Sequence, residues 1–299
     1  MPAADFLSIT ADIAREYPAE QITVVLTGGE PLLRKDLPEI GFRLREQGFR
    51  WGMVSNGFHL TRDVFIQLLN AGMGALTISL DGLEPTHNWL RNHPDSYRRA
   101  REAILMAARS HRLNADVVTC VHKRNLNELP EIAANLSETG IRNWRLFTIS
   151  PIGRARIHDD LHLSPDEFRY LLDFIRNARL DDLQPKPAFS CESFTGSWEG
   201  EVRDGFFFCR AGIHIGSVLA DGSFSACPNI DRSLVQGHMS RDSFPAVWEN
   251  RFSEFRDRAW MKNGPCLSCA HYRFCEGGGM HDRDMQSCEI RRCNFQHEK

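Results

Sequence analysis

Short apolar segments alternate with longer, striped segments over the first 180 residues of the chain. The short segments are rich in β-branched residues, and their length favours buried parallel strands over pieces of helix. They lie at residues 22–26, 52–54, 75–80, 115–119 and 144–149. The alternation predicts parallel strands joined by right-handed crossovers, either in an open sheet or in a barrel.

The longer segments have the period of amphipathic helices, with one apolar stripe each. The clearest stripes are Phe65, Leu68, Leu69 and Gly72, and then Leu129, Ile132, Ala133 and Leu136. A further helix begins at Ser164, which the sequence marks as an N-cap with Pro165 in the first turn and Glu167 closing a capping box.

The alternation breaks at residues 181–205, where two aspartates are followed by Pro185, Pro187, Gly196 and Gly200. Residues of this kind interrupt both helices and strands. We interpret the break as a boundary between a first domain, residues 1–185, and a smaller cysteine-bearing domain, residues 186–299.

Most of the cysteines lie in the second domain. Seven of nine follow residue 200, and three of them have the spacing Cys266-x2-Cys269-x5-Cys275. A Cys-x2-Cys turn brings two thiolates to one metal or cluster edge. The polar, turn-rich surroundings argue against buried free cysteines, and a chain of this size does not need disulfides. The predicted metal ligands are Cys209, Cys227, Cys266, Cys269, Cys275, Cys288 and Cys293.

Composition excludes several classes of protein. The 299 residues are enough for a large buried core, and the net charge of −3 gives no reason to expect nucleic acid as a partner. The first residues lack the basic start and apolar run of a signal peptide, and no apolar stretch is long enough for a membrane span. Many free thiols predict a reducing cytoplasm.

Polar and glycine residues follow directly after several predicted strands. In parallel α/β folds, ligands bind beyond the carboxyl ends of the strands. Paired glycines with a carboxylate beside them suit a cationic group such as an ammonium, whereas phosphate favours a longer glycine loop with a lysine. Each residue alone also fits an ordinary turn, so the prediction depends on their joint occurrence at Gly28, Gly29, Glu30, Asn56, Ser79 and Asp81.

These segments resemble the radical S-adenosylmethionine (SAM) enzymes. Residues 26–32, LTGGEPL, look like the GGE motif after their second strand, and residues 55–57 and 79–82 resemble the motifs of their third and fourth strands. Arg91 stands where many members place an arginine near the SAM carboxylate. Gly222-x4-Cys227 with the later cysteines resembles the SPASM extension, which carries auxiliary iron-sulfur clusters. The cysteine domain is most similar to a group of anaerobic gut-bacterial members encoded beside lipoproteins.

The resemblance implies the fold, the cofactors and the partners. The fold would be α/β, a partial (β/α)6 barrel plus a smaller cysteine-rich iron-sulfur domain. A 4Fe-4S cluster would bind SAM and cleave it with one electron to a 5'-deoxyadenosyl radical, which abstracts hydrogen from a peptide or protein substrate. The electron would come from a donor such as flavodoxin or ferredoxin.

The resemblance also assigns roles to individual residues. Gly28, Gly29 and Glu30 would hold the methionyl ammonium of SAM. Arg91 would hold its carboxylate. The ribose or the methionine end would be contacted by Asn56, Ser79 and Asp81.

The sequence departs from the family at its start. The Cys-x3-Cys-x2-Cys loop of the family is absent, since the first cysteine is Cys120, and the first barrel strand is missing with it. We expect that the sequence is truncated, with the loop encoded upstream of Met1, and as written the chain would not cleave SAM. The alternatives are a non-catalytic iron-sulfur or electron-transfer protein and a zinc-stabilised module, although zinc favours two Cys-x2-Cys pairs.

The number of cysteines predicts one complete auxiliary cluster. Two all-cysteine 4Fe-4S clusters need eight thiolates, and the second domain has seven after residue 200. Cys266, Cys269 and Cys275 would form one cluster with either Cys288 or Cys293. Cys209, Cys227 and the remaining cysteine leave another cluster one ligand short, which Cys191, His281 or a substrate would supply.

Overall fold

A computed structural model describes residues 1–150, 152–190, 194–285 and 287–294. The chain forms two compact units. We call Pro2–Ile149 with Asp160–Phe189 the sheet unit, and Ser150–Asp159 with Ser190–Lys299 the cysteine unit, to which Met1 also belongs.

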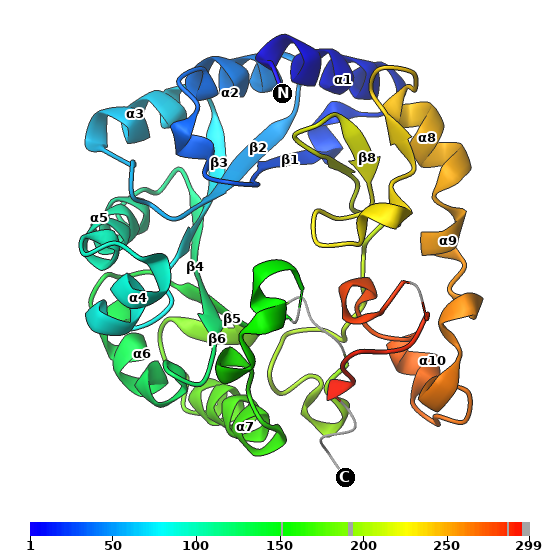
Figure 1. The fold of residues 1–299 in the computed structure, drawn as a ribbon. Coiled ribbons are helices and arrows are strands. Elements are labelled where there is room, and N and C mark those ends of the chain that lie inside the picture. Colours follow the sequence, from blue (N-terminus) through cyan, green and yellow to red (C-terminus); the bar gives the residue numbers. More distant parts are fainter. Residues whose placement is uncertain (151, 191–193, 286, 295–299) are drawn as a thin grey trace. The chain divides into compact units, whose positions relative to one another are not determined.

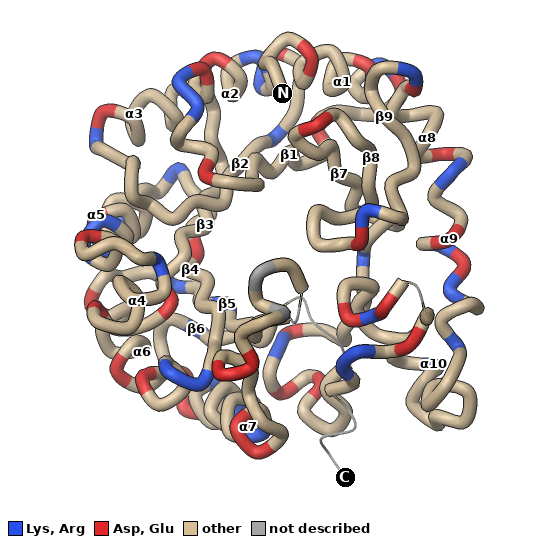
Figure 2. Tube along the Cα trace, in the orientation of Figure 1, with Lys and Arg blue, Asp and Glu red and all other residues tan. Residues whose placement is uncertain are grey.

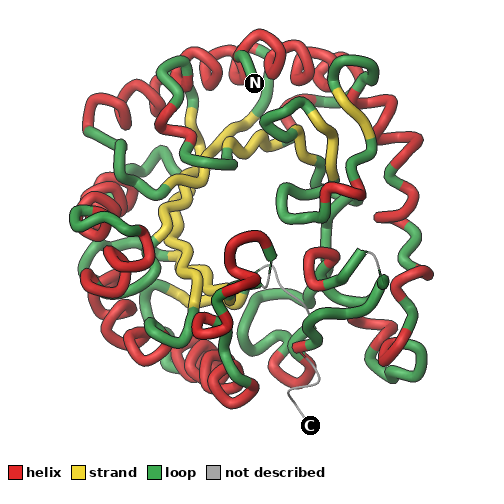
Figure 3. The backbone as a smooth tube through the Cα atoms, viewed as in Figure 1, coloured by secondary structure: helices red, strands yellow, loops and turns green. Residues whose placement is uncertain are grey.

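The sheet unit is built on six parallel strands whose order in the sheet is their order in the chain. Helices cover the convex side of this curved sheet, as Figures 1 and 3 show. Since all six strands run parallel, their carboxyl ends lie at one edge of the sheet. The strands are β1 (Thr23–Leu26), β2 (Arg50–Ser55), β3 (Met73–Ser79), β4 (Asn114–Val121), β5 (Asn143–Thr148) and β6 (Lys186–Phe189).

Helices α6 and α7 bury the apolar stripes that their periodicity predicts. The helix that begins after Ser164 has the predicted capping box: the Ser164 hydroxyl accepts a hydrogen bond from the Glu167 backbone N–H at 3.3 Å, and the Glu167 carboxylate accepts one from the Ser164 N–H at 2.7 Å. The helices are α1 (Ala3–Glu16), α2 (Leu37–Glu46), α3 (Arg62–Asn70), α4 (Glu84–Arg91), α5 (Ser96–Ala108), α6 (Leu129–Ser137) and α7 (Pro165–Leu180).

Strand β6 was not predicted from the sequence, which placed residues 181–205 in a break between domains. Its four residues pair with β5, with Pro187 opposite Trp144, and Arg179 of α7 donates a hydrogen bond to the Pro187 carbonyl at 2.9 Å. Proline is tolerated here because β6 is the last strand of the sheet and need not donate to a further neighbour. The compact units therefore divide after Phe189, so that β6 stays with the sheet.

The cysteine unit has shorter elements. A three-stranded antiparallel sheet contains β7 (Ser217–Val218), β8 (Ser223–Ser225) and β9 (Gly237–His238), and the helices are α8 (Phe244–Arg251), α9 (Ser253–Arg256) and α10 (Tyr272–Cys275). Its apolar core is a chain of aromatic rings in contact, with centroids 5.1–6.3 Å apart: Phe224, Phe244, Trp248, Phe252 and Phe255.

The predicted fold class is confirmed: the chain is α/β, with a parallel sheet and a separate cysteine-bearing unit. Basic and acidic residues are interspersed along the helices of the sheet unit in Figure 2. No helix in the described ranges is long and apolar enough to span a membrane.

Candidate functional site

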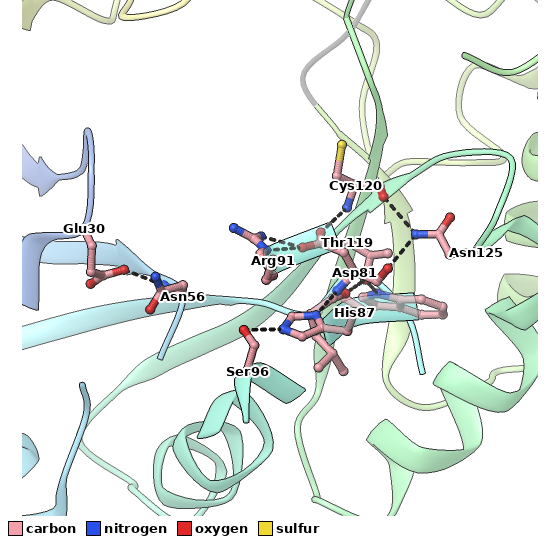
Figure 4. A network of polar contacts seen from close by, with 11 residues as sticks. Glu30, Asn56, Asp81, His87, Arg91, Ser96, Thr119, Cys120 and Asn125 are labelled. Atoms are coloured by element: carbon pink, nitrogen blue, oxygen red, sulfur yellow. Dashed lines mark hydrogen bonds and ion pairs between the residues drawn. The ribbon is translucent and has the colours of Figure 1, made fainter. Parts of the chain in front are cut away.

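The predicted SAM-binding residues gather at one edge of the sheet unit. Glu30 follows β1, Asn56 follows β2, and Asp81 lies just beyond β3, while Arg91 ends helix α4. Figure 4 shows the polar contacts around these residues. They come together because the adjacent parallel strands present their carboxyl ends side by side.

Glu30 ties the loop after β1 to the end of β2. One carboxylate oxygen accepts hydrogen bonds from the Leu32 N–H at 3.1 Å and from the Ser55 hydroxyl at 2.7 Å. The other oxygen accepts one from the Asn56 N–H at 2.8 Å. A carboxylate has about four lone-pair positions, so Glu30 keeps capacity for one further donor. Ser55, which the sequence analysis did not single out as a ligand contact, is buried and orients this carboxylate.

The two glycines before Glu30 leave their backbone accessible. Gly28 and Gly29 are exposed, and a Cβ atom at either position would meet no other atom within 4 Å. Gly28 has φ +123°, a conformation that favours glycine. Because no side chain covers this turn, its carbonyl groups are available to a ligand.

Asn56 and Ser79 differ in how far the protein uses their side chains. The Asn56 amide oxygen accepts a hydrogen bond from the Phe58 N–H at 2.9 Å, which closes a local turn and leaves the amide N–H groups for another partner. The half-buried Ser79 hydroxyl makes no hydrogen bond to any residue that the structure describes. Both residues therefore retain polar groups for a ligand.

Asp81 and Arg91, two residues predicted to contact SAM, form an ion pair with each other. Arg91 Nε and Nη2 lie 2.8 and 2.5 Å from Asp81 Oδ2. The other Asp81 oxygen accepts a hydrogen bond from the Cys120 N–H at 2.9 Å. The Asp81 side chain is 2% exposed and that of Arg91 is 33% exposed. Asp81 therefore positions Arg91, whose side chain remains partly exposed.

His87 belongs to the same network and was missed by the sequence analysis. Its Nδ1 accepts a hydrogen bond from the Asp81 N–H at 2.9 Å, so the neutral ring carries its proton on Nε2, which lies 3.2 Å from the Ser96 hydroxyl. Burial lowers the pKa of His87 to about 4, because desolvation outweighs the attraction of Asp81. A signal was present in the spacing: His87 and Arg91 are one helical turn apart after Asp81.

The segment after β4 makes hydrogen bonds to the turn that contains Asp81. Asn125 donates hydrogen bonds to the carbonyls of Asp81 and Cys120, both at 2.9 Å. Glu128 accepts one from the Leu83 N–H at 2.9 Å, and a Cβ on Gly82, with φ +151°, would lie 2.9 Å from that Glu128 oxygen. The sequence analysis missed Asn125 and Glu128, because nothing local in the sequence links them to a turn more than forty residues earlier.

The cysteine unit brings four of the predicted ligands into one neighbourhood. Burial raises the pKa of Cys275 to about 11, and the nearby thiols of Cys293, Cys266 and Cys269 contribute in the same direction. Within the described residues, no three His, Cys, Asp or Glu side chains surround a position for a single metal ion. A 4Fe-4S cluster instead binds each thiolate through a different iron, and four neighbouring thiols are the donor set it requires.

The structure gives fewer contacts for the remaining predicted ligands. The Cys288 carbonyl accepts hydrogen bonds from Asn263 and Arg283, at 3.0 and 2.9 Å. Cys209 and Cys227 are half-buried. Cys191 lies outside the described residues. A second cluster therefore stays a prediction.

Two segments of the chain match models of known protein families. Residues 10–136 match the model of the radical SAM superfamily, and residues 209–270 match that of SPASM, an iron-sulfur cluster-binding domain. The chain thus contains a radical SAM domain and a SPASM domain. It is thus an enzyme of this class, and the cofactors of the class are SAM and 4Fe-4S clusters.

Relatives of different activity share most of the chain. The AdoMet-dependent heme synthase of Methanosarcina barkeri is 25% identical over 291 residues, covering 90% of this chain and 82% of that protein. The PqqA peptide cyclase of Bradyrhizobium diazoefficiens is 27% identical, covering 86% of this chain and 68% of that protein.

A solved structure supports the fold. Streptococcus suis SuiB bound to precursor peptide SuiA superposes with a TM-score of 0.70 at 16% identity. The match covers 93% of this chain and 64% of the SuiB chain, so the chain spans about two thirds of that protein.

Proposed function

We propose that this protein is a radical SAM enzyme that modifies a peptide or protein side chain through a 5'-deoxyadenosyl radical. The observation that carries the proposal is the convergence of three strand-end motifs at one edge of the sheet, in a chain that also matches the SPASM domain. When bound, the SAM-ligating cluster supplies the electron that cleaves SAM.

The sheet unit would bind SAM through the groups that its own hydrogen bonds leave available. The carbonyls of Gly28 and Gly29, with the remaining lone pair of Glu30, would accept hydrogen bonds from the methionyl ammonium. The outer N–H groups of Arg91 would bind the carboxylate, while Asp81 keeps that guanidinium in place. The Ser79 hydroxyl and the Asn56 amide would contact the ribose or the methionine end, and each is a neutral, weaker contact.

The reaction requires three thiolates at the SAM-ligating cluster, and the first cysteine of the sequence is Cys120. Our proposal for the reaction therefore includes the Cys-x3-Cys-x2-Cys loop that the family resemblance predicts. An electron donor such as flavodoxin or ferredoxin and a cytoplasmic location belong to the same proposal. If the loop is not part of the protein, the alternative is an iron-sulfur protein that transfers electrons without cleaving SAM.

The proposed substrate class is supported by the peptide named in one relative, the PqqA peptide cyclase, and by the SuiB structure with its precursor peptide. A tetrapyrrole is the second candidate, because a heme synthase is similar over 291 residues. Formation of 5'-deoxyadenosine, measured with precursor peptides and with porphyrins, would separate the two. Turnover with porphyrins alone would contradict the peptide assignment.

The SAM site itself is tested by equilibrium binding. Glu30→Ala should weaken SAM binding by about 1.5–3 kcal/mol, the range for a hydrogen bond to a charged group. Glu39→Ala is the matched control, since Glu39 is an exposed carboxylate in the first turn of α2, and it should leave the affinity unchanged. Equal affinity in the wild type and Glu30→Ala would reduce the Gly-Gly-Glu segment to an ordinary turn.

A further inference from the structure

The cysteine unit buries arginines, and two of them have no carboxylate partner among the residues that the structure describes. The three buried arginines in the described part of the chain are Arg203, Arg258 and Arg283. Arg203 pairs with Glu199, Nε to Oε2, at 3.3 Å. Arg258 and Arg283 make no ion pair with any described carboxylate, and both contact a cysteine residue. Of these two, only Arg283 reaches a cysteine sulfur.

Arg283 is 1% exposed. Its guanidinium donates hydrogen bonds to carbonyl and amide oxygens and to one cysteine sulfur. Nε and Nη2 each lie 3.3 Å from the Gly277 carbonyl. Nη1 donates to the Asn263 amide oxygen at 3.2 Å and to the Cys288 carbonyl at 2.9 Å. Nη2 also lies 3.5 Å from Cys266 Sγ. The Cys266 sulfur is thus the one contact of this cation that acquires a negative charge as a ligand.

Neighbouring acids do not neutralise this cation. Asp282, the adjacent residue, lies instead 3.4 Å from Arg292 Nη2 and 3.6 Å from His281 Nε2. A buried charge without a counter-charge is strongly unfavourable, and breaking a buried ion pair is costly for the same reason. The groups that contact Arg283 are carbonyls, an amide and a thiol, which are uncharged. Arg283 is therefore placed to interact with a negatively charged group.

The local backbone is shaped to accept the guanidinium at this position. Gly277 has φ +86°, and a Cβ there would lie 2.8 Å from Arg283 Nη2 and 2.9 Å from Met261 Cβ. A larger residue would thus displace Arg283 from the loop that carries Cys266. Cys266, Cys269 and Cys293 all lie close enough to Cys275 to interact with it electrostatically. A 4Fe-4S cluster with four thiolates carries a net negative charge, which increases by one on one-electron reduction.

We propose that Arg283 is the built-in counter-cation of an auxiliary 4Fe-4S cluster held by Cys266, Cys269, Cys275 and Cys293, and that it raises the reduction potential of this cluster. The cation stabilises the reduced cluster more than the oxidised one, because the reduced form is more negative. The inference rests on the auxiliary cluster of the proposed function. It assigns to this chain a residue that adjusts how readily the cluster accepts an electron.

The test is a redox titration of the whole chain after anaerobic reconstitution with iron and sulfide, using dithionite as reductant and electron paramagnetic resonance to follow the reduced cluster. Arg283→Gln should lower the ratio of reduced to oxidised cluster at a fixed potential by at least about tenfold, equivalent to 59 mV for a one-electron couple. Arg283→Lys keeps the charge and should shift the ratio much less. Arg203→Gln is the control and should leave it unchanged, because Arg203 is neutralised by Glu199.

The outcomes separate this inference from the proposed function. If the wild type incorporates no cluster, the auxiliary site itself is wrong. If the wild type has a cluster and Arg283→Gln has the same potential and iron content, only the role of Arg283 is wrong. If Arg283→Gln loses iron to a chelator, retention in Arg283→Lys supports the charge effect, and equal loss in both variants overturns it.

Discussion

The sheet unit and the cysteine unit differ in the groups that surround their buried charged side chains. In the sheet unit, Asp81 is paired with Arg91 and with the Cys120 N–H, so the protein supplies every partner itself. In the cysteine unit, Arg283 is buried beside the sulfur of Cys266 and makes no ion pair with a carboxylate among the described residues. The buried charge of Asp81 is thus neutralised within the folded chain, whereas the surroundings of Arg283 suit an anionic group.

The largest expected effect is loss of the auxiliary cluster. Cys266→Ala should remove about four iron atoms per chain, because losing one thiolate destabilises a 4Fe-4S cluster and the loops that it ties together. Cys120→Ala, in the sheet unit, is the control and should retain full iron content. Iron and sulfide analysis after reconstitution measures the difference. Equal iron content in Cys266→Ala and Cys120→Ala would show that Cys266 is not a cluster ligand.

The next effect concerns the buried pair of the sheet unit. Asp81→Asn should lower the free energy of unfolding by about 3 kcal/mol, since it removes one partner of a largely buried ion pair. The exposed pair of Asp95 with Arg98 provides the control: Asp95→Asn should change the free energy of unfolding far less, because solvent screens an exposed ion pair. Urea denaturation measures both. A similar small cost at both positions would show that Asp81 is not the electrostatic centre of the turn.

The pH dependence of the sheet unit sharpens the comparison further. The pKa of His87 is lowered from 6.5 to about 4 in the folded chain, so the unfolded chain binds more protons between these values. The contribution of His87 to stability is therefore complete above pH 6.5 and is lost as the pH falls toward 4. At pH 5 the loss should be about 2 kcal/mol.

The variant His87→Asn isolates this contribution, since its amide oxygen is able to accept the Asp81 N–H without titrating. His122 is also buried with a lowered pKa, and it contributes to the pH dependence of both proteins. The stability of the wild type relative to His87→Asn should therefore decrease as the pH falls from 6.5 to 5. A constant difference across this range would contradict the assignment of a neutral, buried His87.

The smallest expected effect is at Ser79. Ser79→Ala should weaken SAM binding by about 0.5–1.5 kcal/mol, the range for a neutral hydrogen bond, and should leave the stability of the sheet unit nearly unchanged because the hydroxyl has no partner within the described residues. Isothermal titration and urea denaturation separate the two quantities. A loss of stability without loss of affinity would make Ser79 part of the sheet and not of the ligand site.

The sequence by itself determined the elements whose causes are local. Apolar periodicity predicted five of the six parallel strands, and Ser164 with Glu167 predicted the start of α7. The Gly28-Gly29-Glu30 and Asn56-Gly57 segments were placed at strand ends for the same reason: each is adjacent in sequence to the strand it follows. Strand β6 was missed because Pro187 within it and Pro185 just before it argue against a central strand, and only the paired sheet shows that it lies at the edge.

Tertiary structure alone decided which distant residues meet. The contact of Asn125 with the Asp81 carbonyl joins residues 44 positions apart, and that of Arg283 with Cys266 joins residues 17 apart. The period of apolar residues and the spacing of motifs depend on neighbours within one segment of the chain, so they predict helices, strands and turns. The partner of a buried charge depends instead on which loops the fold brings within a few ångströms, and no local pattern contains that information.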